Sequence, residues 1–294
     1  MSTYPNVTIG SSTGAAALVT SLTSHFNGTS TKFALSSGVA YDAGDTLCIE
    51  PIADPGAATD WQINIRRTST TAFKVQLDPS GTITDAGSTA AGPTGASSMS
   101  SYEDDWALNT SASPITWFLA EWEDAILFIA RDTTDSFHYQ GFHTGRVFVP
   151  GVQGVPGLSD GFGNMCGTPR LHSFSGGNWF SSGSGDTSVR VSDTGTQATD
   201  WSRYVIGQPA YSSTTISGGN MGGYYYPCPV PLFGSVSTSR CVGILKYLFA
   251  MFPADTADTR LEDPVTGTDR WLHITYSATP QQLVMPWPDA TAPK

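Results

Sequence analysis

Charged side chains are scarce in this chain. They make up 13% of its 294 residues, a low share for a soluble globular protein. Lysine occurs at four positions, which are Lys32, Lys74, Lys246 and Lys294. An ordinary monomeric domain stays soluble through mixed surface charge. A surface of serine and threonine hydroxyls, with 31 Gly and 19 Pro in the chain, is instead expected of a subunit that packs against other subunits.

Clusters of basic residues are missing as well. The formal net charge is −11, and the largest basic run is the pair Arg66-Arg67. Such a chain repels a phosphate backbone, so we expect no nucleic-acid partner. No basic and apolar signal segment opens the chain, and the longest apolar run, residues 117–130, is too short to span a bilayer and carries carboxylates. We therefore expect cytoplasmic synthesis without a signal peptide, and no membrane insertion.

The four cysteines show no CxxC spacing. We therefore expect no zinc site and no structural disulfide, and we expect reduced, mostly buried thiols. One alternative stays open, because Cys228 and Cys241 could form a bridge across a hairpin.

Motifs of catalysis are also lacking, including the P-loop, the dinucleotide glycine fingerprint, GxSxG and HExxH. His138 and His143 are five residues apart, so on a strand they face opposite sides and share a metal ion only if the chain bends. Cys166 and His172 could act as nucleophile and base, but no third orienting group accompanies them. We therefore predict no enzyme, no catalytic residue, no metal site and no cofactor.

Acidic residues gather at two places. Glu121, Glu123 and Asp124 could suggest a glycosidase, because such enzymes use two carboxylates. We interpret them as the solvated tip of an apolar hairpin. The acidic run at 102–105 is interpreted as a solvated turn, with a weak cation site as the alternative.

One helix is predicted, over residues 14–26. Large apolar residues recur there four positions apart, Ser12 or Thr13 can serve as the N-cap, and Gly28 can end the helix.

After residue 30 the pattern changes to short apolar runs that predict strands. We expect a hairpin over 73–85, with its turn at 78–81, and another over 115–132, with its turn at Glu123-Asp124. Residues 241–253 fit either a strand or a short helix, and the glycine-rich stretch 151–188 predicts long ordered loops. Further strands are predicted at 32–36, 46–52, 61–67, 145–150, 188–193, 202–207 and 271–277.

The fold class predicted is mainly β, with an antiparallel β-rich body, long ordered loops and a small α+β N-terminal module that contains the one helix. The stretch 86–101 is nearly free of large apolar residues and predicts a loop or linker. The expected organisation is an N-terminal module over 1–85, the linker 86–101, a β-rich body over 102–278 and a proline-rich C-terminal arm over 279–294.

Two segments are candidate interfaces. Tyr224, Tyr225 and Tyr226 are consecutive among Gly and Pro, so in an extended chain at least one phenol ring points outward, and tyrosine suits interfaces. In the C-terminal arm, Met285 and Trp287 lie among prolines that disfavour both helix and central-strand pairing. We expect Trp287 to anchor this arm in a groove of its own subunit or of a neighbour.

The hydroxyl-rich, lysine-poor surface, the missing signal segment, the helix-then-strands module (14–84) and the arm 284–294 together resemble virion structural proteins of tailed bacteriophages. The resemblance implies a β-rich, homo-oligomeric, non-catalytic subunit of the tail, baseplate or fibre, located in the virion. It implies copies of itself and other virion proteins as partners. A capsid or decoration protein is one alternative, and a carbohydrate-binding or glycan-cleaving tail protein, with a host surface glycan as partner, is another.

Overall fold

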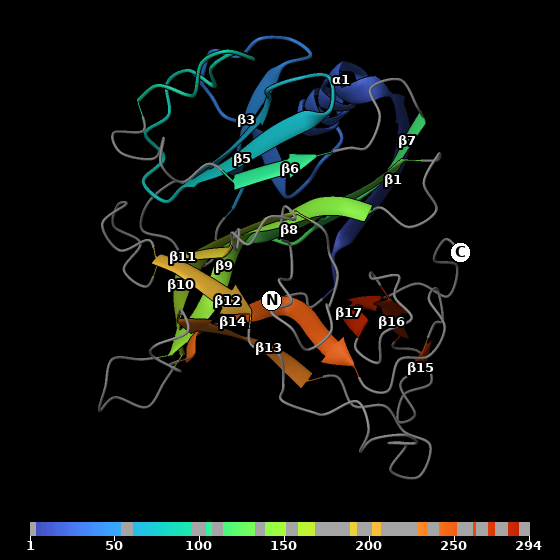
Figure 1. Cartoon of the computed structure of the whole chain (residues 1–294), viewed down its shortest axis with the longest axis vertical. Helices are drawn as coiled ribbons and strands as arrows, with labels where there is room; N and C mark the ends of the chain where they lie inside the picture. Colours follow the sequence, from blue (N-terminus) through green and yellow to red (C-terminus); the bar gives the residue numbers. More distant parts are fainter. Residues whose placement is uncertain are drawn as a thin grey trace.

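The computed structural model describes the backbone of residues 4–53, 61–95, 104–107, 114–132, 139–150, 158–167, 189–192, 202–206, 228–234, 241–251, 261–262, 270–273 and 282–287. Their side chains are described over 4–53, 61–95, 114–130, 141–148, 161–164, 229–230, 244–249 and 285–286. The described part is mainly β, with antiparallel sheets and a single helix near the N-terminus, as predicted. Figure 1 shows the helix and a small sheet lying above a larger sheet.

The N-terminal elements are strand β1 (Asn6–Thr13) and helix α1 (Gly14–Phe26). The predicted helix is confirmed at both ends. Thr13 is the N-cap residue, although its side chain makes no capping hydrogen bond. After Phe26 the chain turns, and the amide of Gly28 donates to the carbonyl of His25 at 3.4 Å. Leu18, Val19, Leu22 and Phe26 are buried, which gives α1 the apolar face that its sequence predicts.

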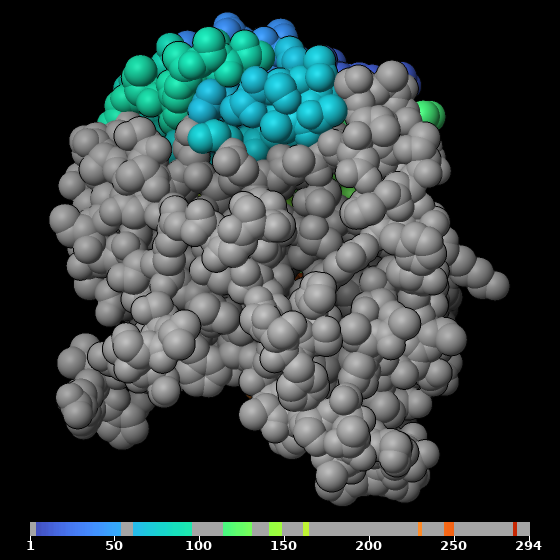
Figure 2. Space-filling model, viewed as in Figure 1, coloured from blue at the N-terminus to red at the C-terminus, as the bar shows by residue number. Residues whose placement is uncertain are grey.

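In the described part of the chain, the smaller sheet has five antiparallel strands that follow one another in sequence. They are β2 (Phe33–Leu35), β3 (Thr46–Pro51), β4 (Gln62–Arg67), β5 (Ala72–Asp78) and β6 (Asp104–Ala107). Three of these strands lie in the predicted runs 32–36, 46–52 and 61–67. In the space-filling view, which has the orientation of Figure 1, residues of the N-terminal part (blue to teal) form the surface at the top of the molecule (Figure 2).

The predicted hairpin over 73–85 is wrong in its second half. The turn forms, because Gly81 has a φ of +59° and its amide donates to the carbonyl of Asp78 at 3.4 Å. Beyond it, the amide of Thr82 donates to the Asp78 carboxylate at 2.7 Å, and the amide of Ile83 donates to the Gln62 side chain at 2.8 Å. Because side chains take these donors, the returning segment forms no ladder with β5, which pairs with β6 instead.

Over the described residues, the larger sheet has twelve strands in the order β1-β7-β8-β9-β10-β11-β12-β13-β14-β17-β16-β15. An additional pairing of β14 with β9 joins the strands from β9 to β14 into a closed ring. The strands after β6 are β7 (Pro114–Glu121), β8 (Ala125–Asp132), β9 (Tyr139–Pro150), β10 (Leu158–Gly167), β11 (Val189–Ser192), β12 (Ser202–Ile206), β13 (Cys228–Gly234), β14 (Cys241–Met251), β15 (Leu261–Glu262), β16 (Arg270–His273) and β17 (Gln282–Trp287).

Most of the strands that the sequence predicts for this sheet are formed. The hairpin over 115–132 is confirmed as β7 and β8, and the strands at 145–150, 188–193, 202–207 and 271–277 contain parts of β9, β11, β12 and β16. Residues 241–251 form a strand, so of the two alternatives for 241–253 the strand is correct and the short helix is wrong. The loop predicted over 151–188 is wrong at 158–167, where β10 pairs with β9 along its full length and buries Phe162. These contacts outweigh the low strand propensity of its glycines. The rest of that loop prediction lies outside the described residues.

The register of β13 and β14 excludes a disulfide between Cys228 and Cys241. Cys228 lies opposite Ala250, and Cys241 lies opposite Phe233. The two cysteines are therefore at opposite ends of this strand pair, far beyond the Cα separation of about 7 Å that a disulfide tolerates.

The C-terminal arm is not the unpaired proline-rich extension that the sequence suggested. Its residues 282–287 form β17, which pairs with β14 through residues 282–284 and with β16 through residues 284–287. Pro286 is accommodated because Val284 is the last residue of β17 that pairs with β14, so the missing amide proton of Pro286 lies beyond that ladder. Residues 282–287 are thus held by the body of the same subunit.

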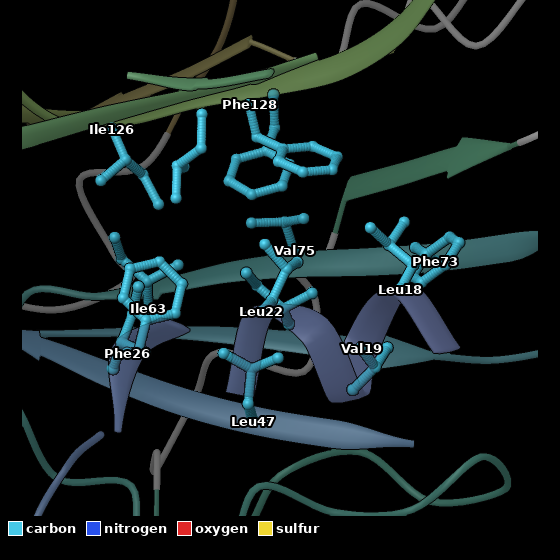
Figure 3. Packing of buried hydrophobic residues seen from close by; sticks show 14 of the residues in the cluster. Leu18, Val19, Leu22, Phe26, Leu47, Ile63, Phe73, Val75, Ile126 and Phe128 are labelled. Carbon is cyan, nitrogen blue, oxygen red and sulfur yellow. The ribbon is translucent and has the colours of Figure 1, made fainter. Parts of the chain in front are cut away.

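The main core lies where α1 and the five-stranded sheet face β7 and β8. In Figure 3, Ile126 and Phe128 of β8 point toward Leu22 of α1 and Val75 of β5. Elements from both sides of the predicted linker 86–101 build this core. Moreover, β1 pairs with β7 of the larger sheet, and β6 pairs with β5 of the smaller one. The division between the two sheets therefore does not fall at 86–101.

Candidate functional site

The tip of the β7–β8 hairpin, residues 121–124, concentrates the carboxylates that the sequence singles out. The amide of Trp122 donates to the carbonyl of Ala125 at 2.9 Å, so Glu123 and Asp124 form a two-residue turn, as predicted. Side chains alternate along a strand, and the tip consequently reaches neighbours on both faces of the larger sheet. We call these four residues the hairpin tip.

On the side of α1, Glu121 joins the helix to the sheet. Its Oε2 lies 2.7 Å from Nε2 of His25, in the last turn of α1. Its Oε1 accepts a hydrogen bond from the hydroxyl of Ser30, in the segment that follows the helix. The side chains of His25 and Glu121 are both buried. Both carboxylate oxygens of Glu121 therefore have partners within the chain.

On the opposite side, Asp124 joins the hairpin tip to β14. The ammonium of Lys246 donates to Asp124 Oδ2 at 2.8 Å, and the hydroxyl of Tyr247 donates to Oδ1 at 2.6 Å. The side chains of this ion pair are almost fully buried, with 2% of Lys246 and 1% of Asp124 exposed. The Lys246 ammonium also lies 4.9 Å from the centre of the Phe148 ring, a distance typical of a cation–π contact.

Tyr247 has an unusual backbone conformation. Its φ of +63° lies in the left-handed region, which is costly for a residue with a side chain. The phenol is held by the hydrogen bond to Asp124 and by the Trp122 ring, which stacks on it at 4.8 Å with an interplanar angle of 9°. The hairpin tip thus fixes a strained point of β14.

The expectation that the three carboxylates form a solvated tip is wrong for two of them. Glu121 and Asp124 are buried, and Glu123 alone of the three keeps a substantial exposed fraction, at 35% of its side chain. Burial of a carboxylate is costly unless cations and hydrogen-bond donors surround it. His25, Ser30, Lys246 and Tyr247 supply those groups. Glu123 pairs with Lys32 at 3.4 Å near the surface.

His143 of β9 is a further buried titratable group near the hairpin tip. Its side chain is fully buried, neither ring nitrogen has a hydrogen-bond partner, and the Trp122 ring lies 6.5 Å away. Burial lowers the pKa of His143 from 6.5 to about 3, so the ring is neutral at pH 7. His138 lies outside the described residues, so the expectation that these two histidines hold no metal ion stays a prediction.

The buried ring of His143 should make the protein sensitive to mild acid. The pKa is lower in the folded than in the unfolded state, so only the unfolded state gains a proton as the pH falls from 6.5 toward about 3. Between pH 7 and pH 5 this group should lower the free energy of unfolding by about 2 kcal/mol. Urea denaturation of the wild type and of His143→Phe at both pH values measures this, and the variant should lack that part of the loss. Equal losses in both proteins would contradict it.

The chemistry available at the hairpin tip is limited by its own contacts. All four oxygens of Glu121 and Asp124 accept hydrogen bonds from the chain, so the described geometry uses these carboxylates to join layers. Among the described side chains, no group of three His, Cys, Asp or Glu residues is placed to hold a metal ion. Cys48 is buried, which raises the pKa of its thiol to about 12 and keeps it protonated and unreactive. The side chains of Cys166 and His172 lie outside the described ones.

The predicted interface residues have different positions. Met285 is fully buried within the subunit, and the backbone of Trp287 pairs with Arg270 of β16. Tyr224, Tyr225 and Tyr226 lie outside the described residues, so their interface role stays a prediction.

A second candidate site, at the outer edge of strand β1, was missed from the sequence. This strand pairs with β7 on one side, and on the other side no further strand among the described residues pairs with it. Ile9, at its middle, is 46% exposed. The alternation of Val7 and Ile9 with Thr8 and Gly10 is a strand signal that could have revealed β1.

No family model matches the chain, and no curated protein matches its sequence. Within the part of the chain that the structure describes, no helix combines the length and the apolar character that a membrane crossing requires.

Proposed function

We propose that this chain is a structural subunit of a phage virion and belongs to the tail, baseplate or fibre. It acts by self-assembly and protein–protein contacts. The observation that carries the proposal is the use of the buried polar groups at the hairpin tip. Glu121 and Asp124 are the carboxylates most suggestive of catalysis, and each of their four oxygens contacts a side chain of the same chain. Their arrangement supports cohesion of a rigid building block.

The composition supports the same proposal. A chain with 13% charged residues and four lysines lacks the mixed charge that keeps an isolated domain apart from its neighbours. The assignment to a phage particle rests on the resemblance of this composition and layout to virion proteins.

The position and copy number of the chain in an assembled particle test the proposal. We expect mass spectrometry of purified virions to detect the chain and immunogold labelling to place it on the tail or baseplate. The number of copies per particle should match that of tail or baseplate components. A copy number matching the capsid lattice would favour the capsid or decoration alternative. Absence of the chain from purified particles would contradict the proposal.

A further inference from the structure

We infer that the outer edge of β1 is a self-association surface, on which the β1 strand of a second copy pairs antiparallel and joins two twelve-stranded sheets into one. The inference rests on the proposed function, because it names the contact through which such a subunit would assemble. It depends on the edge strand and not on the hairpin tip.

The edge of β1 lacks the features that normally prevent strand addition. Exposed edges are usually protected by charge, proline or short length. Strand β1, with the sequence NVTIGSST, has eight residues and contains neither a charged residue nor a proline. Among the described strands, the other three sheet edges are short: β15 has two residues, β2 has three, and β6 has four, of which two are aspartates. Of the four sheet edges formed by the described strands, that of β1 is therefore the one that is long and without charge or proline.

These edges favour a second copy of the chain as the partner. A head-to-tail contact would pair β1 with a different edge, and none of the other described edges has more than four residues. A two-fold symmetric contact pairs β1 with itself and uses nearly the whole strand. Because each copy has a formal net charge of −11, two copies repel each other least at a surface without charged side chains, and β1 provides such a surface.

The register can be derived from the two faces of the strand. Thr8, Gly10 and Ser12 lie opposite Leu119, Trp117 and Ile115, which belong to the core, so these three residues face the core side. Val7, Ile9, Ser11 and Thr13 consequently face the other side. A two-fold axis through Ile9 places the exposed Ile9 of one copy opposite Ile9 of the other and Val7 opposite Ser11. This register covers the largest exposed apolar side chain of the strand.

The strand is held in position before any partner binds. The indole N–H of Trp117 donates to the Ser12 hydroxyl at 3.1 Å, and that hydroxyl lies 3.0 Å from the Ser21 hydroxyl of α1. Near the other end, the Asn6 amide donates to the Thr31 hydroxyl at 2.7 Å. A partner strand therefore meets an ordered edge, and association requires little further ordering.

Charge substitution at the axis tests the inference. Sedimentation velocity over a concentration series should show wild-type dimers, and Ile9→Lys should weaken the dimer at least about tenfold, because two ammonium groups would then face each other across the axis. Ile52→Lys is the matched control, since Ile52 is 56% exposed and lies just beyond β3 of the smaller sheet. It should dimerise like the wild type. An equimolar mixture of Ile9→Lys and Ile9→Glu should recover the dimer, which a misfolded variant could not do.

The outcomes separate this inference from the proposed function. If the wild type self-associates and Ile9→Lys associates equally well, the β1 contact is wrong while self-assembly stands. If Ile9→Lys is weakened but its mixture with Ile9→Glu is not restored, the two-fold register through Ile9 is wrong. If the wild type is monomeric at every concentration, the self-assembly in the proposed function fails, and the inference fails with it.

Discussion

Replacing Asp124 with alanine is expected to lower the free energy of unfolding by about 3–5 kcal/mol. The substitution removes the carboxylate that faces the buried ammonium of Lys246 and accepts the hydrogen bond of Tyr247. A buried cation that loses its counter-ion keeps the cost of desolvation without the compensating attraction. Chemical denaturation followed by tryptophan fluorescence measures the loss.

Two variants control this result. Glu123→Gln alters the neighbouring carboxylate of the same turn, which is 35% exposed and forms a surface ion pair with Lys32, so its effect should stay below about 1 kcal/mol. The double variant Asp124→Leu with Lys246→Met replaces the ion pair with apolar groups and should recover much of the stability, because buried pairs and apolar pairs of similar volume are often equivalent. A loss below about 1 kcal/mol for Asp124→Ala would show that the pair does not hold β14 to the hairpin tip.

Gly145→Ala is expected to destabilise the protein by about 3 kcal/mol or more. Gly145 has a φ of +130°, and a Cβ atom there would lie 2.4 Å from the carbonyl oxygen of Asp124, a backbone atom that cannot rotate away. That carbonyl also accepts a hydrogen bond from the amide of Arg146 at 2.7 Å. The added methyl group therefore strains β9 and separates it from the hairpin tip.

Gly28→Ala is the matched control for this substitution. Its Cβ would meet no atom within 4 Å, so its effect should stay within about 0.5 kcal/mol. Thermal unfolding of both variants beside the wild type makes the comparison. Equal melting temperatures for Gly145→Ala and Gly28→Ala would contradict the described contact between β9 and the hairpin tip.

Local patterns predicted the local elements of this fold. The four-residue spacing of apolar side chains gave α1, and the apolar run broken at Glu123-Asp124 gave the β7–β8 hairpin. Both depend on neighbours in sequence. The failed second half of the 73–85 hairpin depends instead on Gln62, a side chain from another strand that takes the amide of Ile83. Such a contact has no local signal.

Partners distant in sequence likewise explain the error at the hairpin tip. Asp124 was expected in solvent because its partner, Lys246, lies in a different strand. A signal existed, because Lys246 is the lone charge in the apolar run 241–252, and a buried lysine requires a counter-ion. The sequence does not state which carboxylate that is. The prediction of an unpaired C-terminal arm was also wrong. Proline disfavours a central strand unless the ladder on its side of the strand ends, as it does beside Pro286.

The mass of the chain in solution tests the proposed self-assembly most directly. The single chain has a mass of 31.1 kDa. Sedimentation equilibrium of the purified wild type should give a weight-average mass that rises above this value as the protein concentration increases. A mass that stays at 31.1 kDa over the whole concentration range would contradict the proposed self-assembly.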